Sequence, residues 1–381
     1  MPSSTDYFDA SHEAFRDAAR AFLAREVLPH LDEWEDAESF PRELYKKAAD
    51  AGFLGLGYPE EYGGTPCDIF HRVALTEEFC RPGSLGLVAG LFSLNIAIPP
   101  ILALGNEAQK QRFVAPVLAG DKVAALGITE PNAGSDVANI QTRAERRGDK
   151  YIVNGAKTFI TSGCRADFLT TAVRTGGPGA GGVSLLVIES NTPGYRVANK
   201  IQKMGWDASD TAELVFENCE VPAENLLGEE GNGFAGIMRN FQDERLSMAV
   251  MAHAAAQTAY DEALAYTRQR EAFGKPLTGF QVTRHKLVDM MTLITAAREF
   301  NYRVAAKMQA GEYPVAEVSM AKNFACQVCD KVVYDAVQLH GGYGFAREYK
   351  VERLYRDTRI LSLGGGTTEI MKEIIAKWLQ L

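Results

Sequence analysis

The sequence lacks the long apolar segment that a membrane-spanning helix requires. None of its stretches reaches the roughly 18 consecutive apolar residues of a span. The longest one, residues 84–104, is broken by glycines, an asparagine and prolines. The first ten residues are short of apolar side chains, so we expect no signal peptide. These features predict a cytoplasmic protein without a membrane span.

A cluster of like charges is missing as well. The 381 residues include 40 Lys and Arg against 49 Asp and Glu, for a net charge of −9. Proteins that bind nucleic acid usually carry a basic stripe, so we do not expect nucleic acid as a partner. An acidic total still permits a phosphorylated ligand, because a few local arginines are enough to bind phosphate.

Cysteines are few, and only Cys326 and Cys329 are closely spaced as a CxxC pair. Such a pair can act in redox chemistry or supply half of a zinc site. No second pair of ligands lies nearby in the sequence, and residues 315–339 have the pattern of a helix. We therefore interpret both cysteines as small apolar residues packed on a helix, and we expect reduced thiols and no metal ion.

The length predicts two or three domains. A helical pattern covers the first third, short strands between turns follow, and long helical patterns return. The sequence thus predicts an α+β fold with an N-terminal helical domain (1–120), a central antiparallel β-barrel or sandwich (121–230) and a C-terminal four-helix bundle (231–381). The predicted strands cover residues 123–129, 141–147, 151–160, 168–173, 183–188 and 213–221, and the long C-terminal helices cover 233–270, 278–310, 315–339 and 368–379.

Residues 128–137, with the sequence ITEPNAGSDV, follow a predicted strand. This segment offers backbone amides, hydroxyls on Thr129 and Ser135, and a glycine that lets a ligand approach the backbone closely. A planar heterocycle with carbonyl groups, next to a thioester, suits such a loop. A purely structural turn is the alternative.

The segment resembles the signature of the acyl-CoA dehydrogenase family, and four further blocks resemble that family in the same order. They are residues 154–161 (NGAKTFIT), 268–277 (RQREAFGKPL), 335–344 (DAVQLHGGYG) and 355–357 (YRD). The resemblance covers nearly the whole chain, and five ordered blocks are highly specific. It implies a helical bundle, a β-barrel and a second helical bundle, usually assembled as a homotetramer.

The resemblance also implies FAD as the cofactor. The residues that match contacts to FAD are Ile128, Thr129, Gly134 and Ser135, and Ser135 also matches a position near CoA. The residues that match the wall and the hydrogen-bond donors beside the flavin ring are Phe159, Ile160 and Thr161. The residues that match contacts from a neighbouring subunit to the pyrophosphate and adenine half are Arg270, Phe273, Leu277, Gln281, Gln338 and Gly342. Thr367 and Glu369 match a cap over the ribityl and ribose region. The guanidinium of Arg270 suits a pyrophosphate, although its sequence position alone also fits an ordinary surface charge.

The implied reaction removes two hydrogens from adjacent carbons of an acyl-CoA thioester. A base takes the α-proton, the β-hydrogen leaves as hydride to the flavin N5, and an electron-transfer flavoprotein accepts the electrons. A carboxylate with its usual pKa is a weak base for carbon. Burial beside an apolar acyl chain raises that pKa into a more useful range.

The base that many family members carry near the C-terminus is missing, because Gly365 stands at its position within residues 363–368 (LGGGTT). A smaller branch, which includes the long-chain and isovaleryl-type enzymes, has the base on an earlier helix, directly before an arginine. Glu244, followed by Arg245, matches that position. The two departures compensate, which predicts an active enzyme with Glu244 as the catalytic base.

Helical spacing agrees with this assignment. Phe241, Met248 and Met251 fall on the same helix face as Glu244. A carboxylate on such an apolar stripe is costly unless it is paired or functional. The alternatives are a Glu244 salt bridge to a nearby arginine, and Asp243 as the base, which points about 100° further around the helix.

The predicted substrate site comprises Ser135, Phe241, Arg245, Gly364 and Gly365. The two glycines replace larger side chains of other members, so we hypothesise a pocket open to a long or branched acyl chain. Two other functions stay open at this point. One is an oxygen-using flavin relative, such as an acyl-CoA oxidase, a flavin monooxygenase or a nitroalkane oxidase, and the other is a non-catalytic scaffold that binds CoA or flavin.

Overall fold

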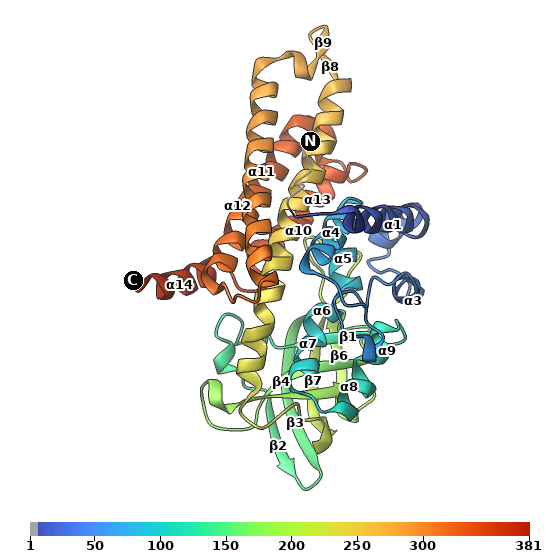
Figure 1. The fold of residues 1–381 in the computed structure, drawn as a ribbon. Helices are drawn as coiled ribbons and strands as arrows, with labels where there is room; N and C mark the ends of the chain where they lie inside the picture. The colour runs from blue at the N-terminus through green and yellow to red at the C-terminus, as the bar shows by residue number, and fades with distance from the viewer. Residues whose placement is uncertain (1–6) are drawn as a thin grey trace.

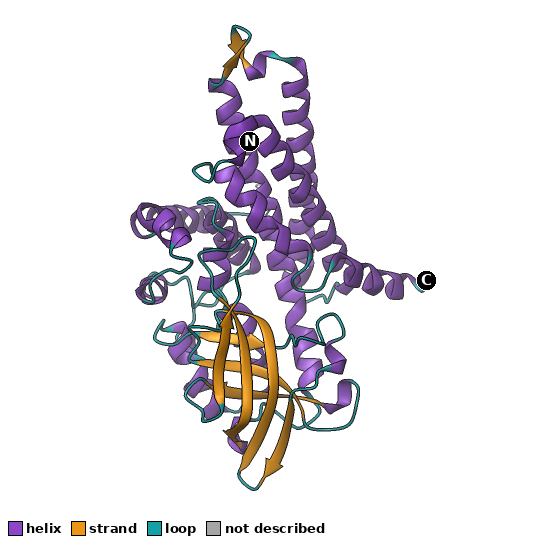
Figure 2. Ribbon diagram, turned by 180° about the vertical axis from the view of Figure 1, so that it is seen from behind, coloured by secondary structure: helices purple, strands orange, loops and turns teal. Residues whose placement is uncertain are grey.

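The computed structural model describes residues 7–381. Short helices from the first third lie beside a curled sheet, and the long helices of the last third extend away from that sheet (Figures 1 and 2). This order of helices, sheet and helices confirms the predicted fold class.

The N-terminal part consists of short helices, two of which begin with an aspartate cap. Asp9 accepts hydrogen bonds from backbone amides in the first turn of α1, and Asp68 does the same for α4. Asp68 also contacts His12 and His71 at 3.0 and 2.9 Å, so it joins α1 to α4. The helices are α1 (Ala10–Glu26), α2 (Leu31–Asp36), α3 (Glu43–Asp50), α4 (Ile69–Cys80), α5 (Leu85–Leu91), α6 (Leu94–Ala97), α7 (Pro99–Leu104), α8 (Glu107–Phe113) and α9 (Ala115–Leu118).

The apolar segment 84–104 forms α5, α6 and α7. Its side chains Leu85, Leu91 and Ile101 are fully buried in the core. Among the described residues, no single helix has the length and apolar character to cross a membrane; only the bent combination of Leu85–Leu91 with Leu94–Leu104 meets that test, by length and composition alone.

The central strands form one sheet in the order β1-β4-β2-β3-β7-β6, and β5 pairs with β4. Most neighbours run antiparallel, as predicted, but β1 pairs with β4 in parallel, and so does β2 through one residue pair. Sequence alternation identifies a strand without identifying the direction of its partner, so this pairing could not be predicted. The strands are β1 (Ala124–Gly127), β2 (Arg143–Arg147), β3 (Lys150–Thr161), β4 (Phe168–Arg174), β5 (Val183–Glu189), β6 (Tyr195–Lys200) and β7 (Thr211–Pro222).

Strand β6 is absent from the sequence prediction. Its four central residues are all exposed, so it lacks the alternation of apolar and polar positions that identifies a half-buried strand. Backbone pairing with β7 holds it in the sheet.

Three long helices dominate the C-terminal part and end within a few residues of the predicted positions. The predicted fourth helix, α14, contacts α12 but projects sideways from the other three (Figure 1). A small hairpin joins α10 to α11 at the end farthest from the sheet. The elements are α10 (Gly233–Gln269), β8 (Glu271–Ala272), β9 (Lys275–Pro276), α11 (Gln281–Gln309), α12 (Val315–His340), α13 (Lys350–Thr358) and α14 (Thr368–Leu379).

Cys326 and Cys329 are free and buried on α12. The Cys326 thiol donates to the carbonyl oxygen of Leu361 at 3.3 Å, and burial raises its pKa to about 12. Both cysteines thus lie where the interpretation as packed helix residues expects them.

Candidate active site

Glu244 lies on α10, and one of its carboxylate oxygens is buried without a hydrogen bond. This oxygen, Oε2, has no partner among the described residues. Met248 and Met251, on the same helix face, are only 8 % and 7 % exposed, and Phe241 packs against the core. A carboxylate oxygen without a donor in such surroundings disfavours folding, which is a feature expected of functional groups.

The surroundings of Glu244 as a whole favour its neutral form more than water does. Burial raises the pKa of Glu244 above the ordinary Glu value, and the positive charges of Lys322 and Arg245 limit that rise. Burial in turn lowers the pKa of both cations. A carboxylate with a raised pKa is a stronger base once it is ionised.

Asp243, the alternative base, has a different environment. Its side chain is 48 % exposed, and its Oδ1 lies 3.9 Å from a guanidinium nitrogen of Arg72 on α4. It therefore points away from the buried face that carries Glu244. Its exposure favours an ordinary solvated charge.

A glycine turn before α14 brings the vacated base position against Glu244. Gly365 and Gly366 have φ angles of 60° and 97°, which side-chain-bearing residues rarely adopt. A Cβ atom built on Gly365 would lie 3.4 Å from Glu244 Oε1 and 2.6 Å from Met248 Sδ. The two positions at which the resemblance places a base thus converge in space, and Met248 fills part of the volume beside Gly365.

Two cations hold this turn. Lys322 Nζ donates to the carbonyl oxygens of Gly364 and Gly366 at 2.6 and 2.5 Å. Arg245 Nε donates to the carbonyl oxygen of Gly365 over a longer distance of 3.5 Å. The guanidinium of Arg245 also lies 5.8 Å from the ring centre of Phe241, so the structure brings together four predicted residues, Phe241, Glu244, Arg245 and Gly365.

A buried ion pair ties the predicted flavin loop to β3. Lys157 Nζ lies 2.8 Å from Glu130 Oε1 and donates to the carbonyl oxygen of Ile128 at 2.9 Å. The Glu130 carboxylate also accepts hydrogen bonds from the backbone amides of Gln141 and Thr142 at 2.6 and 2.9 Å. The start of the loop and the segment just after it are therefore held by one buried ion pair.

The other predicted flavin residues of the sheet differ in exposure. Ile128 and Ile160 are buried, Thr129 and Thr161 are half-buried, and Gly134 and Ser135 are exposed. Phe159 is 65 % exposed and has a positive φ of 59°. It lies where the pairing of β3 with β7 shifts register between Lys157 and Ile160. Such bulges re-aim a side chain and are frequent beside functional sites.

A second group of predicted cofactor residues lies at the far end of the C-terminal helices, around the β8–β9 hairpin (Figure 1). Within one chain, this end is remote from the sheet. Phe273 is 96 % exposed, and Arg270, Gln281, Gln338 and Gly342 are exposed as well. One chain alone does not bring this group to the flavin loop. Leu277, at the base of the hairpin, is half-buried.

Thr367 and Glu369 lie at the start of α14, directly after the glycine turn. The Thr367 hydroxyl accepts a hydrogen bond from the backbone amide of Ile370 at 3.3 Å and caps the helix. Glu369 is exposed.

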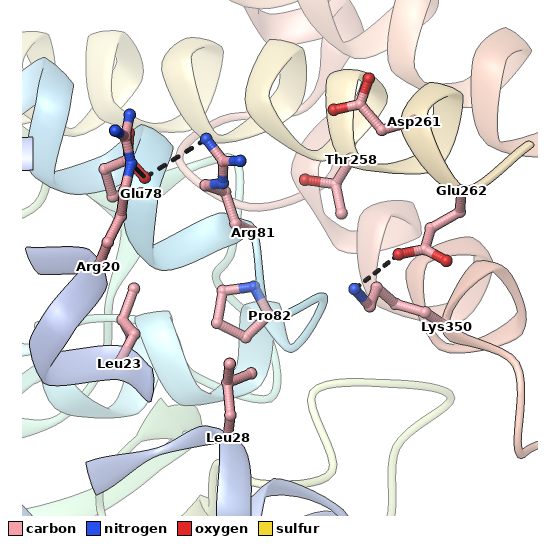
Figure 3. A pocket seen from close by; sticks show the side chains of 10 residues that line it. All are labelled: Arg20, Leu23, Leu28, Glu78, Arg81, Pro82, Thr258, Asp261, Glu262 and Lys350. Atoms are coloured by element: carbon pink, nitrogen blue, oxygen red, sulfur yellow. Dashed lines mark hydrogen bonds and ion pairs between the residues drawn. The ribbon is translucent and has the colours of Figure 1, made fainter. Parts of the chain in front are cut away.

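A surface pocket between α1, α4, α10 and the start of α13 is separate from these groups (Figure 3). Its wall combines aliphatic side chains with charged ones, including the ion pair between Lys350 and Glu262 at 2.7 Å. None of the predicted site residues lines it.

Sequence reasoning missed Lys322, Lys157 and Glu130, and it placed Met248 on the face of Glu244 without its contact to Gly365. Lys157 and Glu130 lie inside blocks that were recognised, but nothing in the sequence pairs them. Lys322 carries a detectable signal, because it is a charged residue on a helix face that also bears Ala325 and Cys326. Its contact with a turn far along the chain has no local signal.

The sequence matches the N-terminal domain of acyl-CoA dehydrogenases over residues 9–121, the middle domain over 125–219 and the C-terminal domain over 231–380. These matches cover most of the chain.

Curated relatives are similar over nearly their whole length. An acyl-CoA dehydrogenase of Bacillus subtilis is 38 % identical and covers 96 % of each chain. A 3-(aryl)acrylate reductase of Clostridium sporogenes is 38 % identical over 97 % of this chain and 98 % of its own. The pig (Sus scrofa) mitochondrial long-chain specific acyl-CoA dehydrogenase is 38 % identical over 97 % of this chain and 86 % of its own.

Solved structures share the fold. A "probable acyl CoA dehydrogenase" from Mycobacterium abscessus is 53 % identical, with a TM-score of 0.97 over 98 % of this chain and 100 % of its own. A chain in a structure described as the electron transferring flavoprotein of Acidaminococcus fermentans is 37 % identical, with a TM-score of 0.94 over 98 % of each. A glutaryl-CoA dehydrogenase from Mycobacterium smegmatis, in complex with FADH2, is 26 % identical, with a TM-score of 0.93 over 99 % of this chain and 96 % of its own.

The chain belongs to the acyl-CoA dehydrogenase family. It is accordingly an oxidoreductase that acts on a CH–CH bond, which confirms the class of enzyme that the sequence blocks predict.

Proposed function

We propose that this chain dehydrogenates an acyl-CoA thioester between its α and β carbons, with Glu244 as the base that removes the α-proton. The observation that carries this proposal is the buried, partnerless Oε2 of Glu244, on a carboxylate whose other oxygen lies 3.4 Å from where a Gly365 Cβ would be. A carboxylate from either position would reach the same space. The sequence has a glycine at position 365 and a carboxylate at position 244, and the closeness of these two positions supports the idea that one replaces the other.

The proton step depends on the surroundings of Glu244. The thioester carbonyl acidifies the α-hydrogen, and the ionised carboxylate accepts it as a proton. Because burial raises the pKa of Glu244, the proton affinity of the carboxylate is closer to what carbon acids require than that of a solvated Glu. The buried guanidinium of Arg245 lies beside it and limits the cost of ionisation.

FAD is the cofactor we propose, and the residues present fit it. The exposed aromatic side chain of Phe159 stands at a bulge beside the loop. A Cβ on Gly134 would meet only a Thr129 methyl group, at 4.0 Å, so the backbone there is open to a ligand. When bound, FAD supplies the acceptor for the β-hydride. The relative with FADH2 supports this assignment.

We propose assembly as a homotetramer, which the remote group around the β8–β9 hairpin supports, and a cytoplasmic location. Arg270 and Phe273 are exposed although they match cofactor contacts, and a neighbouring subunit explains how they reach FAD. An electron-transfer flavoprotein is the acceptor we propose, in agreement with the similarity to a chain described with such a protein.

A long or branched acyl chain is the substrate we propose. Gly364 and Gly365 present no side chain to Glu244, while Met248 occupies part of the space that a larger residue would take, since a Cβ on Gly365 would meet its sulfur at 2.6 Å. Methionine is unbranched and flexible and can shift for different ligands. The relatives include long-chain and isovaleryl-CoA dehydrogenases.

Turnover with a panel of matched straight and branched acyl-CoAs, using an artificial electron acceptor, tests this function. We expect activity that is highest with a long or branched chain. A marked preference for short straight chains would contradict the substrate proposal. Oxygen uptake measured in parallel distinguishes an oxygen-using relative, and inactivity with every thioester would favour a scaffold that only binds CoA or flavin.

A further inference from the structure

Lys322 is a buried lysine on α12 whose ammonium group faces backbone carbonyls. The residue is 1 % exposed, and Nζ donates to the oxygens of Gly364 and Gly366 at 2.6 and 2.5 Å. No carboxylate of the described residues 7–381 lies within 4.0 Å of Nζ. A buried ammonium without a direct counter-ion is costly, so its position is explained by the turn that it binds.

The turn that Lys322 holds has two sides. The carbonyl oxygens of Gly364 and Gly366 point toward α12, while the Cα of Gly365 between them faces Glu244 and Met248 on α10. Gly365 and Gly366 have left-handed backbone angles, and as glycines they have no side chains that would restrain the segment. Lys322 therefore supplies much of what fixes the turn.

The Gly364 amide donates to the carbonyl oxygen of Ile360 at 2.8 Å within the same segment, but the other side-chain tethers of the turn are weaker or lie further away. Arg245 reaches the Gly365 oxygen only at 3.5 Å. Cys326, one helical turn after Lys322, donates its thiol to Leu361, which precedes the turn. Among the side chains of residues 7–381, Lys322 alone binds two carbonyls of the turn at short distance.

We propose that Lys322 is a positioning residue of the catalytic centre, which fixes the wall that the Gly364–Gly366 turn presents to Glu244 and places a positive charge near that carboxylate. The inference rests on the proposed role of Glu244 as the base. It adds Lys322 of α12 to the residues around the base, which otherwise come from α10 and from the turn before α14.

The charges near Glu244 support this role. The groups that face it are Lys322 from α12 and Arg245 from α10, and Lys322 has the larger effect in lowering the pKa of Glu244 against the rise from burial. The groups that face Lys322 are Glu244, Arg245 and Cys326. Within the described part of the chain, removal of the Lys322 charge therefore leaves Arg245 as the one remaining cation that favours ionised Glu244.

The test compares Lys322→Met, Lys322→Arg and Lys331→Met as pH profiles of kcat, with an artificial electron acceptor and the best acyl-CoA of the panel. Lys331 is the matched control, because it lies on the same helix, is 57 % exposed and pairs with Asp335. For Lys322→Met, we expect the acidic limb of the profile to move to higher pH by on the order of one unit, and kcat on the plateau to fall. For Lys331→Met, we expect the wild-type profile.

Lys322→Arg separates charge from position. It keeps the charge but cannot place one compact ammonium between two carbonyls, so the limb should stay near the wild-type pH while kcat falls. An unchanged profile and kcat in both Lys322 variants would overturn the proposal. If Lys322→Met does not fold, the Lys322→Arg variant tests the proposal by itself. A kcat of Lys322→Arg equal to that of the wild type would then overturn the positioning role.

Glu244→Gln, assayed beside these variants, separates the two claims. If Glu244→Gln is inactive and the Lys322 variants behave as wild type, only the role of Lys322 fails. If Glu244→Gln keeps full activity, the proposed base is wrong, whatever the Lys322 variants do.

Discussion

The buried ion pair between Lys157 and Glu130 leads to a quantitative prediction for the flavin loop. The Lys157 side chain is 0 % exposed and that of Glu130 is 5 % exposed. Burial lowers the pKa of Lys157 to about 8, with Glu130 opposing the change. Burial alone would raise the pKa of Glu130, but Lys157 and the backbone donors outweigh it and lower the pKa. Both groups are therefore charged at neutral pH.

Lys157→Met leaves the Glu130 carboxylate buried with two backbone donors and no cation. Breaking a buried pair in this way typically costs about 3–5 kcal/mol of the free energy of unfolding. Adding Glu130→Gln removes the unpaired charge. Its amide can satisfy only one of the two backbone amides, so the double variant should lose about 1–3 kcal/mol. The second substitution thus restores part of the stability that the first one removes.

Equilibrium urea unfolding at neutral pH checks this, with protein and FAD concentrations held constant because bound cofactor and assembly both shift apparent stability. Lys150→Met is the matched control, since Lys150 begins the same strand and forms an exposed pair with Glu220 at 2.7 Å. We expect little change there, because exposed pairs contribute little. A double variant less stable than Lys157→Met would refute the reasoning.

Three further predictions concern the site. Because burial raises the pKa of Glu244, the wild type loses stability as pH rises from the usual Glu range through the folded-state pKa. The Glu244→Gln variant cannot ionise at this position, so its melting temperature should be higher than that of the wild type at neutral pH. The difference in melting temperature should close at about pH 4. A gap independent of pH, in melting curves, would contradict this. Met248→Ala enlarges the space beside Gly365 and should raise kcat/KM for branched or long acyl-CoAs relative to short ones; an unchanged ratio would show that Met248 does not limit the pocket. Phe273→Ala removes a side chain that is 96 % exposed in one chain, so it should weaken tetramer assembly and FAD retention, measured by light scattering and flavin content, and retention of both would argue against a contact from the neighbouring subunit.

Much of the fold could be predicted from the sequence. The long helices have clear 3.6-residue periodicity, and α14 has the bounds predicted for it, Thr368–Leu379. The direction in which α14 projects could not be predicted, because helical periodicity does not specify which neighbour a helix packs on. Strand β6 was missed because its exposed residues carry no alternation.

For the candidate site, the sequence predicts Glu244 and the empty position at Gly365, but not their contact in space. Lys322 was missed for a related reason: its partners are backbone carbonyls in a distant turn, and carbonyls carry no sequence signature. The cofactor residues around Arg270 and Phe273 stay predictions, since one chain does not bring them to the flavin loop.

The central claim is that Glu244 is the base. Anaerobic titration of the purified flavoprotein with the acyl-CoA panel tests it most directly, for wild type, Glu244→Gln and the neighbouring control Asp243→Asn. We predict that the flavin absorption bleaches in the wild type and in Asp243→Asn, but not in Glu244→Gln. Equally fast bleaching in Glu244→Gln would contradict the account, and loss of bleaching only in Asp243→Asn would assign the base to Asp243.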